Sequence, residues 1–314
     1  MLDMCVSGSQ FFNTQNIQNI GCSAVHDDDP LKILRDKCAF TASFDSAGRC
    51  DALQCHPETR KVIKESLIFW VDSAAAESNL KWVYGSVGVG KSALSKWIAE
   101  YYTKKGQLAA SFLFFRGHQD TCGLHKFIPT ITYLTAISDT VPLARARIIE
   151  RIKNDPTIFM KSFESQWERL VIEPLTSAQR PVLIVIDGID EITSADEQTS
   201  LLRCILNSLR RVGPFIKVLL VSRLESQIRE EFDTFGLSKA SRISLGASHA
   251  DRSDLRVFLT LSLGQVHQRR HKNGTMTRVS APWPPPHIID KLVNMADLQL
   301  IYATILIAFI DDKN

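Results

Sequence analysis

Five short segments of the chain are almost continuously apolar, and polar or glycine-containing stretches separate them. They cover residues 80–85, 109–115, 181–187, 217–222 and, more weakly, 241–245. Runs of this length without polar alternation are typical of strands that are covered on both faces, as in a parallel sheet between helices. The pattern therefore predicts five buried strands.

Helical patterns fill several of the spaces between these runs. Apolar residues recur on one face over about 59–73, and a second helix is expected over 91–104. Beyond the fifth strand, 251–268 is amphipathic and 288–310 is again helical, with the proline-rich sequence SAPWPPPH as a stiff connection between them. The most apolar part, 298–310, is shorter than the ~20 residues that a membrane-spanning helix needs, so we interpret it as a buried core helix.

Strands that alternate with helices indicate an α/β fold with a doubly wound, mainly parallel sheet, followed here by a small helical subdomain. Residues 1–54 are predicted to be an irregular segment, because the first forty are polar and rich in Asn and Gln. Residues 55–248 then form the α/β domain, and 249–314 form the helical subdomain.

The composition fits a globular protein that requires neither a nucleic-acid nor a membrane partner. Of the 314 residues, 45% are hydrophobic and 23% are charged, and the formal net charge is only +3. The short basic run HQRRHK, at residues 267–272, is predicted to be a solvated loop.

The seven cysteines, an odd number, do not form a disulfide framework and fit reduced thiols in a cytoplasmic protein. Cys50, Cys55 and His56 resemble half of a zinc site, but no second Cys/His pair follows at ligand spacing, so no zinc site is predicted. The N-terminus lacks the apolar segment flanked by basic residues that marks a secretory signal.

The turn between the first strand and the next helix carries the sequence Gly-x-x-x-x-Gly-Lys-Ser. Glycines let the backbone wrap so that successive N–H groups point at phosphate oxygens, at the start of the helix. Lys91 would then reach the β- and γ-phosphates, and the Ser92 hydroxyl would bind Mg²⁺. The alternative is a glycine turn that binds nothing, but the strand before and the helix after favour nucleotide binding. The predicted nucleotide-binding residues are Gly85, Ser86, Val87, Gly88, Val89, Gly90, Lys91 and Ser92.

The third strand ends in Asp187, and two more acids follow on the same loop. P-loop NTPases hold magnesium with an acid at this place, so Asp187 is predicted to bind the nucleotide's metal together with Ser92. An acid on so apolar a strand needs a cation partner. Asp190 and Glu191 are candidates to orient or deprotonate an attacking water, with a solvated acidic loop as the alternative.

Two arginines follow strands at the same edge of the predicted sheet. Arg223 comes directly after the fourth strand, at the carboxyl edge where open α/β sheets bind ligands, and is a candidate to contact the γ-phosphate. Arg116 follows the second strand, and a structural and a functional role are equally open for it. The candidate catalytic residues are therefore Asp190, Glu191 and Arg223.

Taken in order, these motifs resemble the NACHT domains of STAND-class signalling NTPases and, within these, the fungal NOD-like receptor proteins. The resemblance rests on the P-loop, ASFLFFR, LIVIDGIDE and VLLVSRLES, together with CHPETR at residues 55–60, which is similar to a C-x-x-G-T-R segment of the family. Gly188, directly after Asp187, matches a small residue typical of NACHT proteins. The resemblance covers roughly residues 39–310.

The resemblance implies a cytoplasmic switch in signal transduction and fungal innate immunity. Such a switch binds ATP or GTP with Mg²⁺, hydrolyses it slowly and contacts protein partners in a signalling assembly. It implies P-loop, Walker B and sensor roles for Lys91, Ser92, Asp187, Asp190, Glu191 and Arg223.

The chain departs from this family at three places. Glu58 stands where the C-x-x-G-T-R segment has glycine, and Leu298 stands where the last helical segment has a glycine before LFIYA. The chain ends at Asn314, where the winged-helix domain and the repeats of these receptors would follow, so a truncated receptor is expected, with a short paralogue or a remnant as the alternatives.

Two other functions stay open from the sequence. One is a generic P-loop ATPase or phosphotransferase, although neither an arginine-rich lid nor an acceptor pocket is evident. The other is a non-catalytic interaction module in which nucleotide is structural or absent. Nucleotide binding by the wild-type chain separates the module from the other two.

Overall fold

A single parallel sheet forms the centre of the α/β domain. The computed structural model describes residues 29–46, 55–74, 78–246 and 249–312. The strands within these residues are β1 (Leu80–Gly85), β2 (Leu108–Leu113), β3 (Val182–Asp187), β4 (Ile216–Ser222) and β5 (Arg242–Leu245). Each lies within two residues of its expected bounds, so all five predicted strands are confirmed.

The strand order brings the motif-bearing strands together. The sheet runs β2-β3-β4-β1-β5, and every neighbouring pair is parallel. β4 therefore lies between β1 and β3, and the carboxyl ends of all three meet at one edge of the sheet. The P-loop, Asp187 and Arg223 follow these three ends.

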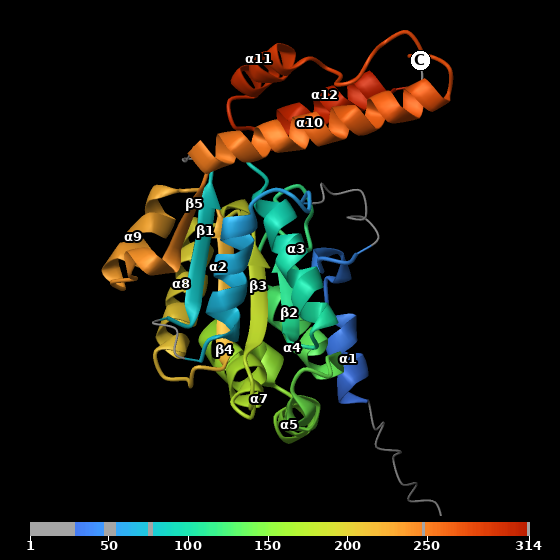
Figure 1. Ribbon diagram of the computed structural model, residues 1–314. Coiled ribbons are helices and arrows are strands. Elements are labelled where there is room, and N and C mark those ends of the chain that lie inside the picture. The colour runs from blue at the N-terminus through green and yellow to red at the C-terminus, as the bar shows by residue number, and fades with distance from the viewer. Residues whose placement is uncertain (1–28, 47–54, 75–77, 247–248, 313–314) are drawn as a thin grey trace, which may run out of the picture.

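Helices cover both faces of the sheet (Figure 1). α2 (Lys61–Asp72) and α3 (Lys91–Lys104) pack on one face, whereas α4 (Phe127–Ile137), α8 (Ala195–Leu209) and α9 (Ser226–Thr234) pack on the other. The expected helix over 91–104 is thus confirmed at both ends. The architecture is three layers, α/β/α.

Residues of β3 alternate between the two layers of helices. Val182, Ile184 and Ile186 pack in the cluster that includes α4 and α8, and Leu183 and Val185 pack in the cluster with α2 and α3. All five side chains are buried. Burial on both faces explains why this strand shows no polar alternation in sequence, and it confirms the doubly wound α/β fold.

Further helices complete the α/β domain at its lower end and side (Figure 1). They are α1 (Pro30–Asp36), α5 (Pro142–Asn154), α6 (Phe163–Gln166) and α7 (Glu173–Leu175), and a π-helix over Trp167–Ile172 joins the last two.

α1 lies inside the segment that was expected to be irregular. The Asp29 carboxylate accepts a hydrogen bond from the Leu31 N–H, Pro30 is the first helical residue, and Leu34 is fully buried in the core that includes α4. The helix depends on one capping residue and one buried side chain, and the overall polar composition of the segment does not indicate either of them. Residues 1–28 and 47–54 lie outside the described residues, so the three-part division stays a prediction.

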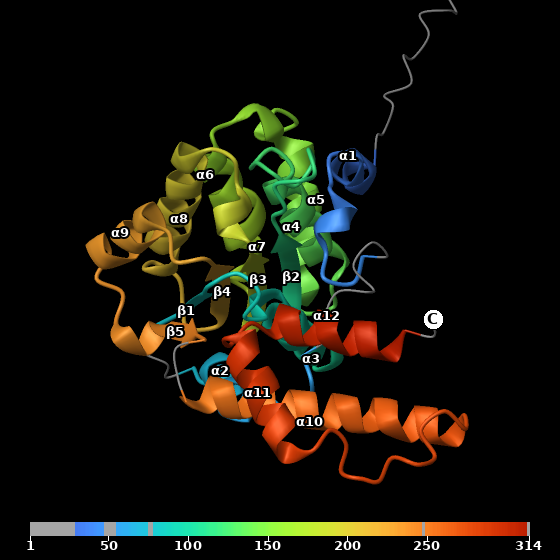
Figure 2. The ribbon, with the colours of Figure 1, turned by 90° about the horizontal axis from the view of Figure 1, so that it is seen from above.

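Three helices form a separate layer across the carboxyl end of the sheet (Figures 1 and 2). They are α10 (His249–Lys272), α11 (Pro286–Ala296) and α12 (Leu300–Asp311), and they confirm the helical pattern beyond the fifth strand. Their shared core contains Leu255, Leu259, Leu263, Ile289, Val293, Ala296 and Ala303. Figure 2 shows α12 crossing over the sheet next to α3.

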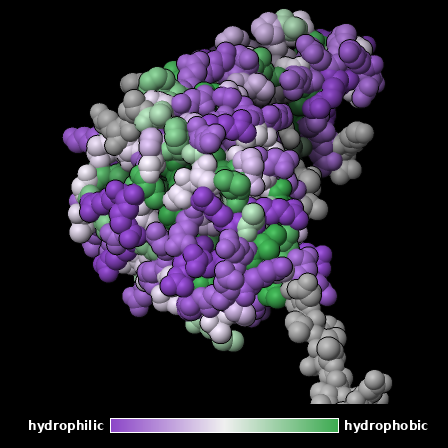
Figure 3. All heavy atoms as spheres, turned by 90° about the horizontal axis from the view of Figure 1, so that it is seen from below, coloured by the Kyte–Doolittle hydropathy of each residue, from purple (hydrophilic) through white to green (hydrophobic). Residues whose placement is uncertain are grey.

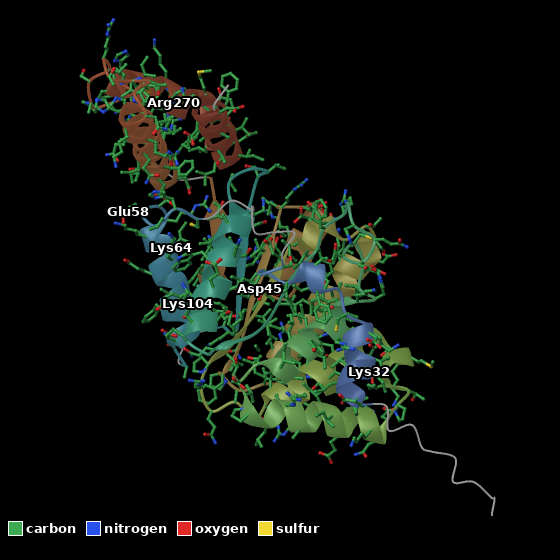
Figure 4. The ribbon with its side chains drawn as sticks, turned by 90° about the vertical axis from the view of Figure 1, so that its right-hand side faces the viewer. Lys32, Asp45, Glu58, Lys64, Lys104 and Arg270 are labelled. Atoms are coloured by element: carbon green, nitrogen blue, oxygen red, sulfur yellow. The ribbon has the colours of Figure 1, made fainter. Side chains whose placement is uncertain are left out.

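The basic run HQRRHK belongs to α10 and is not a solvated loop, so that prediction was wrong. His267 is buried, with its Nε2 2.9 Å from the Val279 carbonyl, and Arg269 pairs with Asp311 of α12. Arg270 lies at the far end of the helical subdomain (Figure 4). Basic residues are favourable in the last turn of a helix because they face the negative end of its dipole.

The prediction that 298–310 is a buried core helix was also wrong. α12 is helical, but Ile305 is 63% and Phe309 is 78% exposed, and Ala303 is the residue of this helix that is buried. α10 and α11 cover one side of α12, and among the described residues no second layer of helices covers the side with Ile305 and Phe309. Among the described residues, no helix combines the length and the apolar character needed to cross a membrane.

The corner between α11 and α12 has an unusual backbone. Asp297 and Leu298 have φ values of 42° and 64°, so both are left-handed, a conformation that glycine adopts most readily.

Polar side chains cover most of the molecule's lower face. In Figure 3 hydrophilic residues predominate there, and hydrophobic ones show in smaller areas between them. This distribution is ordinary for the surface of a folded domain.

Candidate functional site

The P-loop joins β1 to α3 in a conformation that depends on its glycines. Gly88 and Gly90 have φ values of 77° and 87°, and a Cβ added to Gly85 would lie 2.6 Å from the Leu245 carbonyl oxygen of β5. The loop therefore wraps tightly and delivers its N–H groups to the start of the 14-residue helix α3. This combination of directed N–H groups and a helix N-terminus is suited to an anion.

Lys91 lies against the loop that precedes it. Its Nζ donates to the carbonyl oxygens of Gly85 at 2.9 Å and Ser86 at 2.8 Å. Burial lowers the pKa of Lys91, and the nearby carboxylates of Asp190 and Asp187 act in the opposite direction. The acids of the site thus favour the charged ammonium.

Asp187 ends β3 as a buried carboxylate beside the first turn of α3. It is 4% exposed, and the Ser95 hydroxyl donates to its Oδ2 at 2.6 Å. Burial raises the pKa of Asp187, while hydrogen bonds from Ser95 and Ser92 and the charge of Lys91 oppose that rise. Ser92 and Asp187 are therefore adjacent. Together they offer a hydroxyl oxygen and a buried carboxylate, and oxygen ligands of this kind fit Mg²⁺.

Asp190 and Glu191 form ion pairs with Arg223. Arg223 Nε lies 3.1 Å from Asp190 Oδ2, its backbone N–H donates to Asp190 Oδ1 at 2.8 Å, and its Nη2 lies 3.1 Å from Glu191 Oε1. The structure thus brings the three candidate catalytic residues together, but as partners of one another. Asp190 is buried and the Arg223 side chain is 44% exposed, so the arginine is the accessible member.

Two residues fix the acidic loop against the end of β2. Arg116 Nη2 donates to the Asp190 carbonyl at 2.7 Å, which gives Arg116 a structural role. Gly188 has a φ of 77°, and a Cβ there would lie 2.6 Å from the Phe114 carbonyl oxygen. Glycine is required at this position because a Cβ would collide with the backbone of the neighbouring segment.

These groups surround one cavity of about 480 Å³, a size that suits a small-molecule ligand. Nine of the predicted site residues line it: Val87, Gly88, Gly90, Lys91, Ser92, Asp187, Asp190, Glu191 and Arg223. Gly85, Ser86 and Val89 shape the loop without lining the cavity. The remaining lining residues are Ala93, Leu113, Phe114, Phe115, Gly188 and Ile301.

The sequence did not indicate several contacts of this site. Ile301 comes from α12, and its N–H donates to the Gly88 carbonyl at 3.1 Å, a contact between segments far apart in the chain. Arg60 donates to the Val89 and Gly90 carbonyls from the segment before α2. Ser95 is the contact that the sequence could have indicated. It follows Ser92 by three positions in a predicted helix, so both side chains are expected on the same face.

The site can be compared with known proteins. The family described as Nephrocystin 3, N-terminal matches residues 58–223, more than half of the chain, from just before Arg60 to Arg223. Among solved structures, the chain is similar to the one titled "Structure of C. elegans PCH-2", with 14% identity over 82% of this chain and 65% of that chain and a TM-score of 0.44. The chain thus spans less than two thirds of that protein's length. No curated protein matches the chain. On the extent of the family match, the chain belongs to the Nephrocystin 3, N-terminal family, and its α/β domain is a P-loop NTPase-like domain.

Proposed function

We propose that the chain is a NACHT-type signalling NTPase, which binds ATP or GTP with Mg²⁺ and hydrolyses it slowly as a conformational switch, as in fungal NOD-like receptor proteins. The single observation that supports this most is the cavity shared by the P-loop, Asp187 and the group of Arg223 with two acids. The P-loop follows β1, Asp187 and the two acids lie at the end of β3, and Arg223 follows β4, all at one edge of the sheet.

The phosphates are bound by the P-loop and the start of α3. The N–H groups of the loop supply hydrogen-bond donors, and the helix N-terminus supplies partial positive charge. Lys91 adds a full positive charge. Its ammonium, which contacts Gly85 and Ser86, moves from these carbonyls to the phosphate oxygens.

Ser92 and Asp187 would hold the metal. When bound, Mg²⁺ would supply positive charge that offsets the negative charge developing on the phosphate oxygens. Ser95 keeps the Asp187 carboxylate oriented by donating to its Oδ2. A metal also removes the cost of keeping this carboxylate ionised away from water.

Water attack on the γ-phosphate is assigned to Asp190 or Glu191 as the group that orients the water and accepts its proton. Both carboxylates are engaged by Arg223, so Arg223 must first leave them. Its guanidinium then pairs with the γ-phosphate. Hydrolysis therefore depends on a rearrangement of ion pairs, which suits a slow switch better than a metabolic phosphotransferase.

The helical subdomain is the part that reports the nucleotide state. Ile301 of α12 lines the cavity and bonds to the P-loop, so changes in the loop reach α12 directly. The proposal includes protein partners that recognise this state in a cytoplasmic signalling assembly.

The test is binding of labelled ATP and GTP, with and without Mg²⁺, to the wild-type chain, Lys91→Ala and Lys104→Ala. Lys104 lies at the other end of the same helix as Lys91, near the bottom of α3 in Figure 4, and is the matched control. We expect Mg²⁺-dependent binding by the wild type and Lys104→Ala and none by Lys91→Ala. If the wild type binds neither nucleotide and melts at the same temperature with and without them, the chain is a non-catalytic interaction module.

A further inference from the structure

Arg60 is a buried arginine next to the P-loop that no step of the proposed hydrolysis uses. It is 5% exposed and directly precedes α2. In Figure 4, Glu58 and Lys64, which lie on either side of it in the sequence, are at the end of α2 that faces the helical subdomain. A buried guanidinium needs partners for its donors, and these partners indicate its role.

The guanidinium of Arg60 holds two carbonyls of the P-loop. Nη1 donates to the Gly90 carbonyl at 3.1 Å, and Nη2 donates to the Val89 carbonyl. The Gly88 carbonyl accepts the N–H of Ile301 at 3.1 Å. Three consecutive carbonyls of the phosphate-binding loop are therefore held by donors outside the loop.

This arrangement determines where the N–H groups of the loop point. In a planar trans peptide the C=O and the following N–H point in opposite directions. Arg60 does not line the cavity, so its guanidinium holds the carbonyls of Val89 and Gly90 away from it and directs the N–H groups of the next residues, Gly90 and Lys91, to the cavity side. That is the side on which a phosphate would accept them.

The backbone of Arg60 connects this clamp to the helical subdomain. Its N–H donates to Asp254 Oδ2 of α10 at 2.9 Å. Arg60 also has a φ of 56°, a left-handed conformation that costs about 1 kcal/mol for a residue with a side chain. The Asp254 bond and the buried guanidinium hold it there, so the position of Arg60 depends on where α10 lies.

We propose that Arg60 is a positioning residue: it holds the P-loop in the form that binds phosphate, and through Asp254 it makes that form dependent on the position of the helical subdomain. The inference rests on the proposed function in so far as the ligand is a nucleoside triphosphate. Preorganised donors bind an anion more tightly because the loop loses less conformational freedom on binding.

The test uses Arg60→Met, Arg60→Lys and Asp254→Ala in the full chain, with Lys61→Met as the control. Lys61 is the next residue, is exposed and pairs with Glu58 at the surface. Two quantities are measured: the Kd for Mg²⁺–ATP and Mg²⁺–GTP, and hydrogen–deuterium exchange of residues 86–91 in the nucleotide-free protein. Exchange of β3 serves as the internal reference for global stability.

Arg60→Met is expected to raise the nucleotide Kd by about tenfold, the loss typical of one hydrogen bond to a charged group, and to speed exchange of residues 86–91 while β3 stays protected. Arg60→Lys, which keeps the charge but not the fork of donors, is expected to recover part of the affinity. Asp254→Ala is expected to weaken binding by about threefold, as for one lost hydrogen bond. Lys61→Met leaves both quantities unchanged.

The outcomes separate this inference from the proposed function. If the wild type binds nucleotide and Arg60→Met binds it equally well, the inference fails and the proposed function stands. If the wild type binds none, the proposed function fails, and unchanged exchange of residues 86–91 in Arg60→Met would overturn the inference as well. If Arg60→Met does not fold, wild-type affinity and exchange in both Arg60→Lys and Asp254→Ala would overturn it.

Discussion

β3 and α12 are both strongly apolar and line the same cavity, but they differ in exposure. Every residue of β3 is buried, including the acid Asp187 that it presents to the cavity. In α12, which presents Ile301, the side chains of Ile305 and Phe309 are 63% and 78% exposed. Apolar sequence therefore does not by itself make a core; the segment must also have a layer on each side.

The difference divides the cavity into two unlike walls. The sheet wall is held by helices on both faces, so the geometry of its strand ends is fixed by packing. The helix wall rests on α10, α11 and a few contacts with the P-loop. Segments with few buried contacts open at low free energy, so we expect motion on the helix side and chemistry on the sheet side.

The largest expected contrast is in stability. Ile184→Ala, which truncates a fully buried side chain of β3, is expected to lower the free energy of unfolding by about 3 kcal/mol. Ile305→Ala, at an exposed position of α12, is expected to change it by less than about 0.5 kcal/mol. Urea unfolding measures both. Equal losses would mean that α12 has a partner on its exposed side in solution.

The second expected contrast is in hydrolysis. Glu191→Gln is expected to slow nucleotide hydrolysis by about 100-fold while the Kd changes little, because the amide accepts a water proton poorly. Asp196→Asn, a few residues later and exposed, is the control for a change of charge near the loop. Single-turnover hydrolysis measures the rate. Normal turnover in both Glu191→Gln and Asp190→Asn would show that neither acid activates the water.

The third prediction concerns the charge of Asp187. Because burial raises its pKa, the folded state holds the proton more tightly than the unfolded state, and stability falls as pH rises from the unfolded pKa through the folded one. Without Mg²⁺ at pH 7, Asp187→Asn is therefore expected to melt at a higher temperature than the wild type. With Mg²⁺ it is expected to bind nucleotide about tenfold more weakly, since one of the metal's ligands is weakened. A lower melting temperature without metal would contradict the first half of this prediction.

The smallest expected effect comes from the helix wall itself. Ile301→Ala keeps the N–H that bonds to Gly88 and removes only side-chain contacts with the P-loop. We expect a change of up to about threefold in nucleotide Kd and no change in the rate of hydrolysis once nucleotide is bound. Calorimetric titration beside the wild type measures the first. A loss as large as that of Arg60→Met would mean that α12 also holds the ligand.

The sequence was sufficient to predict the sheet and the residues at its edge. β3 and β4 are apolar without alternation because both of their faces are covered. Their sequence pattern therefore indicates directly that they are buried strands. The P-loop, Asp187 and Arg223 each follow such a strand, and parallel strands of one sheet end at one edge. Their meeting in a single cavity follows from these two facts.

The features that could not be predicted depend on contacts between distant segments. Arg60 lies in a motif that the sequence displayed, yet its clamp on Val89 and Gly90 depends on a side-chain direction set by a left-handed backbone. Arg223 could pair with several charged groups at this edge of the sheet. The spacing of residues in the sequence does not decide that it pairs with Asp190 and Glu191. The exposure of α12 depends on whether another part of the fold packs against it, and the local sequence pattern does not contain that information.

The two left-handed residues between α11 and α12 restrict how freely the corner between these helices can bend. Replacing Leu298 by glycine would relieve the strain of about 1 kcal/mol that a side chain meets at positive φ. The same replacement would open the whole positive-φ region to the corner, since glycine is not confined to the narrow left-handed well that leucine occupies. Leu298 thus accepts a small local strain and keeps the corner to a single bend direction, and Leu298→Gly is expected to make the corner above the P-loop more flexible.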